Sequence, residues 1–289
     1  VEEMESGCLS IFAGAGLSAA SGYVDWKTLL VPMSKSLGLN VNMDLTLLAQ
    51  YYKNKYSRSE LNRAILNEFA KIPLQNDNME ILSRLPIRKY WTTNYDSIIE
   101  DVLRKSGKIV DVIIDQVQFK DHTMDRDVVV YKMHGDRTFP DSTILCKEDY
   151  ELYDESRVLF TQGLTLELVT NTVLFIGFSF SDPNLDRIMA LVRKLNKDST
   201  PKTHYCFMRS VRLEDYFQDG KISDESIQQY EQDRNMQRLK LEDMKNYGIQ
   251  PIVVESFDQI TLMLKYIERK YSLNSVFISG ALNPETPND

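Results

Sequence analysis

Cysteine is scarce in this sequence. Only Cys8, Cys146 and Cys206 occur among 289 residues, and no two of them form a CxxC pair. A structural zinc site built from four cysteines is therefore excluded, and the sequence provides no disulfide framework. Isolated thiols of this kind are typical of proteins from a reducing compartment, so we expect a cytoplasmic location.

A membrane-spanning run and an excess of positive charge are also missing. The longest apolar run, residues 173–178, is far shorter than the roughly 20 residues that cross a bilayer, and residues 1–7 do not resemble a signal peptide. The numbering starts without Met, which leaves an earlier leader open. Because 42 acidic residues outnumber 34 basic ones, the net charge is -8. We therefore expect neither a membrane nor a nucleic acid as partner.

Short apolar runs alternate with helical patterns along most of the chain. Strands are predicted to begin at Leu9, Lys89, Ile109, Asp127, Thr172, His204 and Pro251. Helices are predicted over residues 26–37, 97–105, 157–169, 183–194, 223–247 and 260–271. This order predicts an α/β fold with a Rossmann-like, doubly wound parallel sheet.

Two stretches depart from the alternation. Residues 45–85 contain no convincing strand, and Leu61, Ile65, Phe69 and Ile72 recur at helical spacing on one apolar face. We interpret residues 41–88 as a helical insertion, the alternative being part of the outer helical layer.

The second stretch is the C-terminal tail. Residues 275–281 are predicted as a strand that enters a glycine turn. We interpret residues 1–273 as one domain and residues 274–289 as a linker and the start of a truncated second domain. The alternative for this strand is an edge position in the same sheet.

Four predicted strands end in abrupt polar turns. These turns contain a glycine pair at 14–16, Asn-x-Asp at 94–96, His-Gly at 134–135 and Gly-x-Ser at 177–179. In an open parallel sheet, the carboxyl ends of strands meet at one edge, where ligands bind. The four turns therefore predict a nucleotide site that also carries reactive groups.

The glycine turn fits a phosphate-binding pattern. Residues 14–19 match GxGxxG/A between a strand and a helix, where glycine lets a pyrophosphate approach the backbone. A dehydrogenase would also need an acidic residue about 20 positions further on, at the end of a second strand. That position falls in the helical segment 32–36, so hydride transfer is disfavoured.

The same turns, taken in order, resemble the signature of the sirtuins. Residues 14–26 resemble its GAG-hydrophobic-Ser turn with the following Ser-Gly and Asp-aromatic pairs, and residues 93–96 resemble its Gln-Asn-Ile-Asp element. Residues 134–135 match its His-Gly, and residues 177–179 resemble its Gly-Thr-Ser. The resemblance covers about residues 9–190.

The sequence resembles more closely the sirtuin-like domain of the Thoeris-type (ThsA) antiphage NAD hydrolases. Shared segments are 22–24, 90–96, 131–136, 177–180 and 182–186. In that family a SLOG-type nucleotide-sensing domain follows, and residues 276–280 resemble its first strand. The two CxxC pairs of sirtuin deacylases are absent, so this resemblance implies no zinc ribbon and speaks against protein deacylation.

The resemblance also implies roles for individual residues. Asn94 and His134 would form the catalytic pair, and Asp96 would lie near the carboxamide of NAD. Contacts to phosphate and ribose would come from Ala13, Gly14, Ala15, Ser18 and Asp25, and contacts to the adenosine half from Gly177 and Ser179. NAD would be the substrate, with no other cofactor and no metal.

The chemistry of NAD cleavage is consistent with Asn94 and His134 as a catalytic pair. Nicotinamide leaves NAD as a neutral molecule without needing a proton, so the paired carboxylates of ordinary glycosidases are unnecessary. An amide can orient ribose or water without adding a charge, and an imidazole with a pKa of about 6.5 can accept a proton at neutral pH.

The implied function is hydrolysis of NAD to ADP-ribose and nicotinamide, in antiphage defence by NAD depletion. A signal nucleotide of the cyclic ADP-ribose type would act at the downstream domain, and we expect a homo-oligomer, namely a tetramer. Two alternatives stay open: ADP-ribosyl transfer to another acceptor, and a sensor that binds NAD without turnover. Asn94 has a simpler alternative as a helix cap, and so has Asp182 before Pro183.

Overall fold

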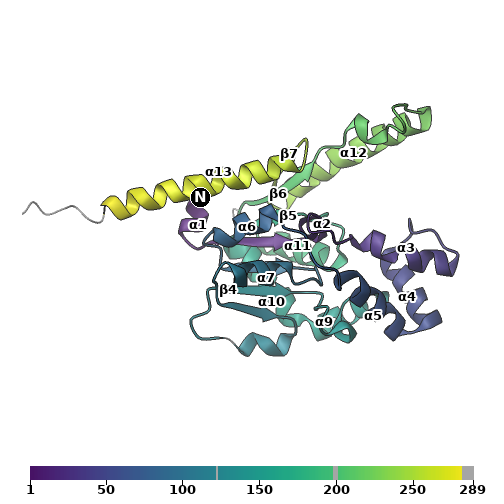
Figure 1. The fold of residues 1–289 in the computed structure, drawn as a ribbon, viewed down its shortest axis with the longest axis horizontal. Helices are drawn as coiled ribbons and strands as arrows, with labels where there is room; N and C mark the ends of the chain where they lie inside the picture. Colours follow the sequence, from purple (N-terminus) through teal and green to yellow (C-terminus); the bar gives the residue numbers. More distant parts are fainter. Residues whose placement is uncertain (122, 198–200, 282–289) are drawn as a thin grey trace, which may run out of the picture.

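A parallel sheet forms the centre of the molecule. The computed structural model describes residues 1–121, 123–197 and 201–281, with only the backbone for 275–281 (Figure 1). The strands are β1 (Leu9–Ala13), β2 (Lys89–Thr92), β3 (Val110–Ile113), β4 (Val128–Lys132), β5 (Thr172–Ile176), β6 (His204–Arg209) and β7 (Ile249–Val254). All neighbours pair in parallel, in the order β3-β4-β2-β1-β5-β6-β7. The predicted α/β fold is confirmed.

Helices cover both faces of this sheet. The α-helices of the described residues, including those that lie away from the two faces, are α1 (Glu2–Glu5), α2 (Ala15–Ala19), α3 (Trp26–Leu37), α4 (Leu45–Tyr56), α5 (Arg58–Phe69), α6 (Asp77–Arg84), α7 (Ile98–Lys105), α8 (Lys147–Glu151), α9 (Tyr153–Ser156), α10 (Val158–Thr170), α11 (Pro183–Leu195), α12 (Asp224–Asn246) and α13 (Asp258–Ala281). Three short 3-10 helices span Gln116–Lys120, Pro140–Ser142 and Leu213–Tyr216.

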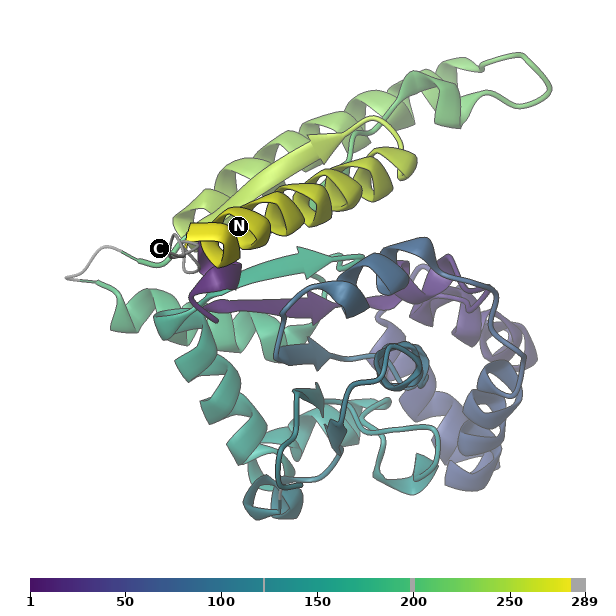
Figure 2. The same cartoon turned by 60° about the vertical axis from the view of Figure 1, so that its left-hand side comes forward.

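The core is divided into two layers because side chains alternate along each strand. In β1, Ile11 and Ala13 pack in one cluster with α6, α7 and α13, whereas Phe12 packs in the other cluster with α10 and α11. Figure 2 shows α12 and α13 on opposite sides of β7, at one end of the sheet. Each strand in the centre is thus buried on both faces, as expected for a parallel sheet.

The helical stretch between β1 and β2 has two parts. Figure 1 shows α3, α4 and α5 beyond the carboxyl ends of the strands, whereas α6 lies over the sheet beside α7. The expected apolar face of this stretch is correct at Leu61, Ile65 and Phe69, which are buried, and wrong at Ile72, which is 92% exposed. The helix ends before Ile72 because Pro73 follows it, and a residue before proline avoids the helical conformation.

The strand expected at residues 275–281 is also wrong. Helix α13 continues to Ala281. A helix that has already formed gains a hydrogen bond with each added residue, so it extends through a short apolar run that would favour a strand in isolation. Residues 282–289 lie outside the described part of the chain. Among residues 1–121, 123–197 and 201–281, no helical segment has both the length and the apolar character needed to cross a bilayer.

Strands β1 and β5 meet where the sheet changes its direction of winding. Successive strands after β1 are added on the β2 side, and later ones on the β5 side, so this is a topological switch point. The two turns touch through their backbones. Gly14 N–H donates to Ile176 O at 2.9 Å, and Gly16 N–H donates to Gly177 O at 2.8 Å.

Glycine is required at these positions by space. A Cβ on Gly16 would lie 2.9 Å from Gly177 Cα, and a Cβ on Gly177 would collide with the backbone of Gly16 and Leu17. Gly177 also has a φ of +65°, in the left-handed region that disfavours side chains. The turns can therefore approach this closely only without side chains.

We predict that Gly177→Ala lowers the free energy of unfolding by about 3 kcal/mol, because left-handed strain of about 1 kcal/mol is added to an overpacking cost of about 2 kcal/mol. Gly107→Ala is the matched control, since Gly107 has a φ of +87° and no atom of the described residues lies within 4 Å of the place that an added methyl group would occupy. Gly107→Ala should lower the free energy of unfolding by only about 1 kcal/mol, the cost of the left-handed strain. Urea unfolding of both variants measures the difference, and equal losses would contradict the packing argument.

Candidate functional site

A cavity of about 1030 Å³ opens at the carboxyl ends of the strands, around the switch point. Most of the residues expected at the site line it: Ala15, Ser18, Asp25, Asn94, Asp96, His134, Gly177 and Ser179. Further walls come from α3, β6 and the start of α13. The volume is at the upper end of the range of small-molecule sites, large enough for an extended ligand.

Ala13 and Gly14 do not line this cavity. Ala13 is fully buried, and its carbonyl oxygen accepts a hydrogen bond from Thr92 Oγ1 at 2.9 Å. The N–H groups of Gly14 and Gly16 already donate to the β5 turn. The glycine turn therefore packs β1 against β5.

Asn94 is fixed by the turn after β1. Its Nδ2 donates to Gly14 O at 3.0 Å and to Ser18 Oγ at 2.9 Å, and the side chain is buried. Both N–H groups of the amide are thus used, which leaves the amide oxygen for a ligand or water. Asp96 lies one residue before the N-cap Ser97, and its Oδ1 accepts from Ile98 N at the start of α7 at 3.1 Å.

A buried lysine joins the asparagine turn to the histidine turn. Lys132, at the end of β4, donates to the carbonyl oxygens of Tyr95 and Asp96 and pairs with Glu100 and Asp136. Burial alone would lower the pKa of Lys132, but the two carboxylates outweigh it and raise the pKa, so the ammonium stays charged. Sequence reasoning missed this residue, although it lies two positions before His134.

His134 is 3% exposed and packs edge-on against the rings of Tyr150 and Tyr153. Its Nε2 lies 3.3 Å from Asp182 Oδ2. Burial lowers the pKa of His134, and this effect together with the nearby Arg157 exceeds the opposing effect of Asp182. The imidazole is therefore neutral at pH 7, as a proton acceptor must be.

The two carboxylate oxygens of Asp182 have different partners. Its Oδ1 accepts from the N–H groups of Asn184 and Leu185, so it caps α11 as the structural interpretation expected. Its other oxygen faces His134 and accepts a hydrogen bond from Tyr150 OH at 3.4 Å. Tyr150 in turn stacks on Trp26, with ring centroids 6.2 Å apart, and both rings line the cavity.

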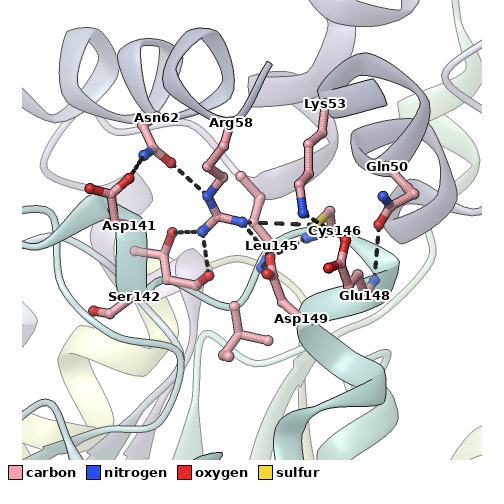
Figure 3. A network of polar contacts seen from close by, with 12 residues as sticks. Gln50, Lys53, Arg58, Asn62, Asp141, Ser142, Leu145, Cys146, Glu148 and Asp149 are labelled. Atoms are coloured by element: carbon pink, nitrogen blue, oxygen red, sulfur yellow. Dashed lines mark hydrogen bonds and ion pairs between the residues drawn. The ribbon is translucent and has the colours of Figure 1, made fainter. Parts of the chain in front are cut away.

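The segment after His134 is clamped by an arginine from the helical stretch, as Figure 3 shows. Arg58, at the start of α5, pairs with Asp149 at 2.7 Å and donates to the carbonyl oxygen of Thr143 at 2.6 Å. The adjacent Ile144 N–H donates to His134 O at 3.0 Å, and Ile144 O accepts from Tyr95 OH at 2.6 Å. The clamp therefore supports both turns that carry the expected catalytic pair.

No group of three or more metal-binding side chains gathers within the described ranges 1–121, 123–197 and 201–281. His204 has a structural position, because its Nδ1 accepts from Val173 N at 3.2 Å between two strands. His122 lies outside the described residues.

The chain is similar to several known proteins. The family model of the SIR2-like domain matches residues 88–238. The chain is 41% identical over 94% of its length to the NAD(+) hydrolase ThsA of Cytobacillus dafuensis, and 40% identical over 94% to that of Bacillus cereus strain MSX-D12. It is 29% identical over 71% of its length to defense-associated sirtuin 2 of Bacillus subtilis. The chain covers 55% and 56% of the two ThsA proteins and 21% of the third relative.

We predict that Arg58→Met lowers the free energy of unfolding by about 3 kcal/mol, because it leaves the largely buried Asp149 carboxylate without its charged partner. Arg63→Met is the control on the same helix, since the Arg63 side chain is 65% exposed and pairs with Glu60. That variant should stay within about 0.5 kcal/mol of wild type. Denaturant unfolding measures both, and a similar small loss in the two variants would show that the clamp contributes little.

Proposed function

The chain belongs to the SIR2-like domain family, and from this premise we propose that it hydrolyses NAD at the bond between nicotinamide and ribose. The observation that carries the proposal is the meeting of Asn94 and His134 at one cavity, from the turns after β2 and β4. Binding alone needs neither a free amide oxygen nor a neutral imidazole there. The name of the ThsA relatives, NAD(+) hydrolase, supports the same substrate.

The reaction balances with the groups present. The bond between the pyridinium nitrogen and C1′ of the ribose breaks, and its electron pair stays on the departing nicotinamide. A water oxygen forms the new bond to C1′, and one proton of that water goes to His134. The products are ADP-ribose, nicotinamide and a proton. Asn94 orients the water or the ribose through its amide oxygen.

The remaining residues of the cavity would hold the dinucleotide. In this proposal Asp96 lies near the carboxamide, Ala15, Ser18 and Asp25 near phosphate and ribose, and Gly177 and Ser179 near the adenosine half. Gly14 acts through its carbonyl oxygen, which fixes Asn94, and Ala13 through the backbone of β1. NAD is the substrate, and we assign no zinc and no further cofactor.

The wider role that we propose is antiphage defence by depletion of NAD. The defence-related name of the Bacillus subtilis relative and the extra length of the ThsA relatives support it. A hydrolase of this kind must be restrained in a healthy cell. We propose that restraint comes from assembly into a homotetramer and from a downstream domain that binds a signal nucleotide of the cyclic ADP-ribose type.

We predict that the protein, incubated with NAD and no acceptor, with and without a signal nucleotide of the cyclic ADP-ribose type, releases nicotinamide and free ADP-ribose under at least one of these conditions. His134→Ala should slow turnover by about 10²–10⁴-fold because the proton acceptor is lost, and Asn94→Ala by about 10²-fold because orientation is lost. Chromatography of the products measures both rates.

The control is Asn246→Ala, an exposed position at the end of α12, which should retain full turnover. Full turnover in the Asn94 and His134 variants would refute the site. Consumption of NAD only when an acceptor is present would favour ADP-ribosyl transfer, and binding of NAD without turnover would favour a sensor.

A further inference from the structure

The two oxygens of the Asp182 carboxylate serve different purposes: one caps a helix and the other faces the imidazole of His134. Oδ1 accepts from Asn184 N at 2.9 Å and from Leu185 N at 3.1 Å, at the start of α11. Oδ2 faces His134 Nε2 at 3.3 Å and accepts from Tyr150 OH. Two backbone amides and one phenol therefore hold the carboxylate in place, so it cannot turn away from the imidazole.

Both side chains of this pair are largely buried, at the wall of the cavity. Asp182 is 9% exposed and His134 is 3% exposed. The charged and titratable groups around the imidazole are Asp182 before α11, Arg157 before α10, Tyr150 in α8 and Tyr153 in α9. Among these, Asp182 carries the carboxylate, and a charge acts strongly across such a short distance in a buried site.

The contact is not yet a well-aligned hydrogen bond. Within the described residues, His134 Nε2 is buried and has no hydrogen-bond partner, although the carboxylate oxygen lies only 3.3 Å away. Catalytic hydrogen bonds are often long or poorly aligned before substrate binds. Once the ring is realigned, a proton on Nε2 would point to the carboxylate, which leaves Nδ1 with its lone pair.

We propose that Asp182 is a positioning residue for His134, which holds the imidazole with its proton on Nε2 and stabilises the imidazolium that forms during the reaction. This inference rests on the proposed NAD hydrolysis. The proton of the attacking water passes to Nδ1, the carboxylate of Asp182 stays ionised, and the imidazolium then returns the proton to solvent. In a similar way, a carboxylate that accepts a hydrogen bond from a metal-binding histidine orients the ring and raises its basicity.

Asp182→Asn separates the two tasks of the side chain. Asparagine caps a helix about as well as aspartate, so α11 keeps its N-cap while the negative charge disappears. We expect kcat to fall by about 10–100-fold, with KM changed by less than about threefold. Asp186→Asn is the matched control, because it makes the same change four residues later on the exposed side of α11 and should leave both constants unchanged.

The pH dependence of kcat/KM should shift in a defined direction in Asp182→Asn. The Asp182 carboxylate raises the pKa of His134, so its removal lowers that pKa and keeps the imidazole neutral to lower pH. The acid limb of kcat/KM should therefore move to lower pH in Asp182→Asn, by about one unit. A helix cap without an electrostatic role predicts an unshifted limb, and that result would overturn the inference.

An NMR titration of His134 tests the effect of Asp182 on its pKa without measuring turnover. The chain contains three histidines, so the His134 signal can be assigned by its loss in His134→Gln. In Asp182→Asn the His134 pKa should lie below that of wild type, or the ring should stay neutral down to the pH of unfolding. An unchanged pKa would overturn the inference even if wild type hydrolyses NAD. Absence of NAD hydrolysis by wild type, both with and without a signal nucleotide of the cyclic ADP-ribose type, would instead overturn the proposed function.

Discussion

The site depends on the close approach of two backbone turns at the centre of the sheet. Gly14 and Gly16 lie against Gly177 without intervening side chains, and this contact fixes the turns after β1 and β5 at the switch point. The turns after β2 and β4 are placed relative to this contact, because β2 pairs with β1 and β4 pairs with β2. A side chain at this contact would widen the edge of the sheet at which every expected catalytic and binding residue is placed.

Buried polar groups then fix the individual side chains. Lys132 connects the turn of Asn94 with the turn of His134, and Arg58 holds the segment that packs behind both. Such groups are costly to bury unless each is paired, so a site built from them has little freedom to rearrange. This rigidity agrees with a reaction in which most of the work is to place a ribose and a water correctly.

Local signals in the sequence predict much of this structure. Helix α3 is predicted from Trp26 to Leu37 because helical spacing ends at Gly38, and the structure has these bounds with Gly38 in the left-handed region. The strands and their polar turns are predictable because apolar runs that end abruptly are a local feature. Because parallel strands share one edge, the turns can also be placed together before any contact is known.

The rest depends on contacts between segments far apart in the chain. The pairing of Asp182 with His134 joins two separate turns, and a helix cap is sufficient to explain an Asp before Pro183. Lys132 resembles an ordinary residue of an apolar strand, and Arg58 a solvated helix residue. Two helix ends are predicted wrongly, in opposite directions. The helix expected to include Ile72 ends earlier because Pro73 follows it, whereas α13 continues through a run that resembles a strand.

The central claim is that Asn94 and His134 converge on C1′ of the nicotinamide ribose. A crystal structure of the protein with a carbocyclic NAD analogue that cannot be hydrolysed tests it most directly. The account predicts that the ring carbon equivalent to C1′ lies within contact of both side chains, with the diphosphate near the start of α2. A dinucleotide bound outside the cavity, or one whose C1′ position faces away from His134, would contradict it.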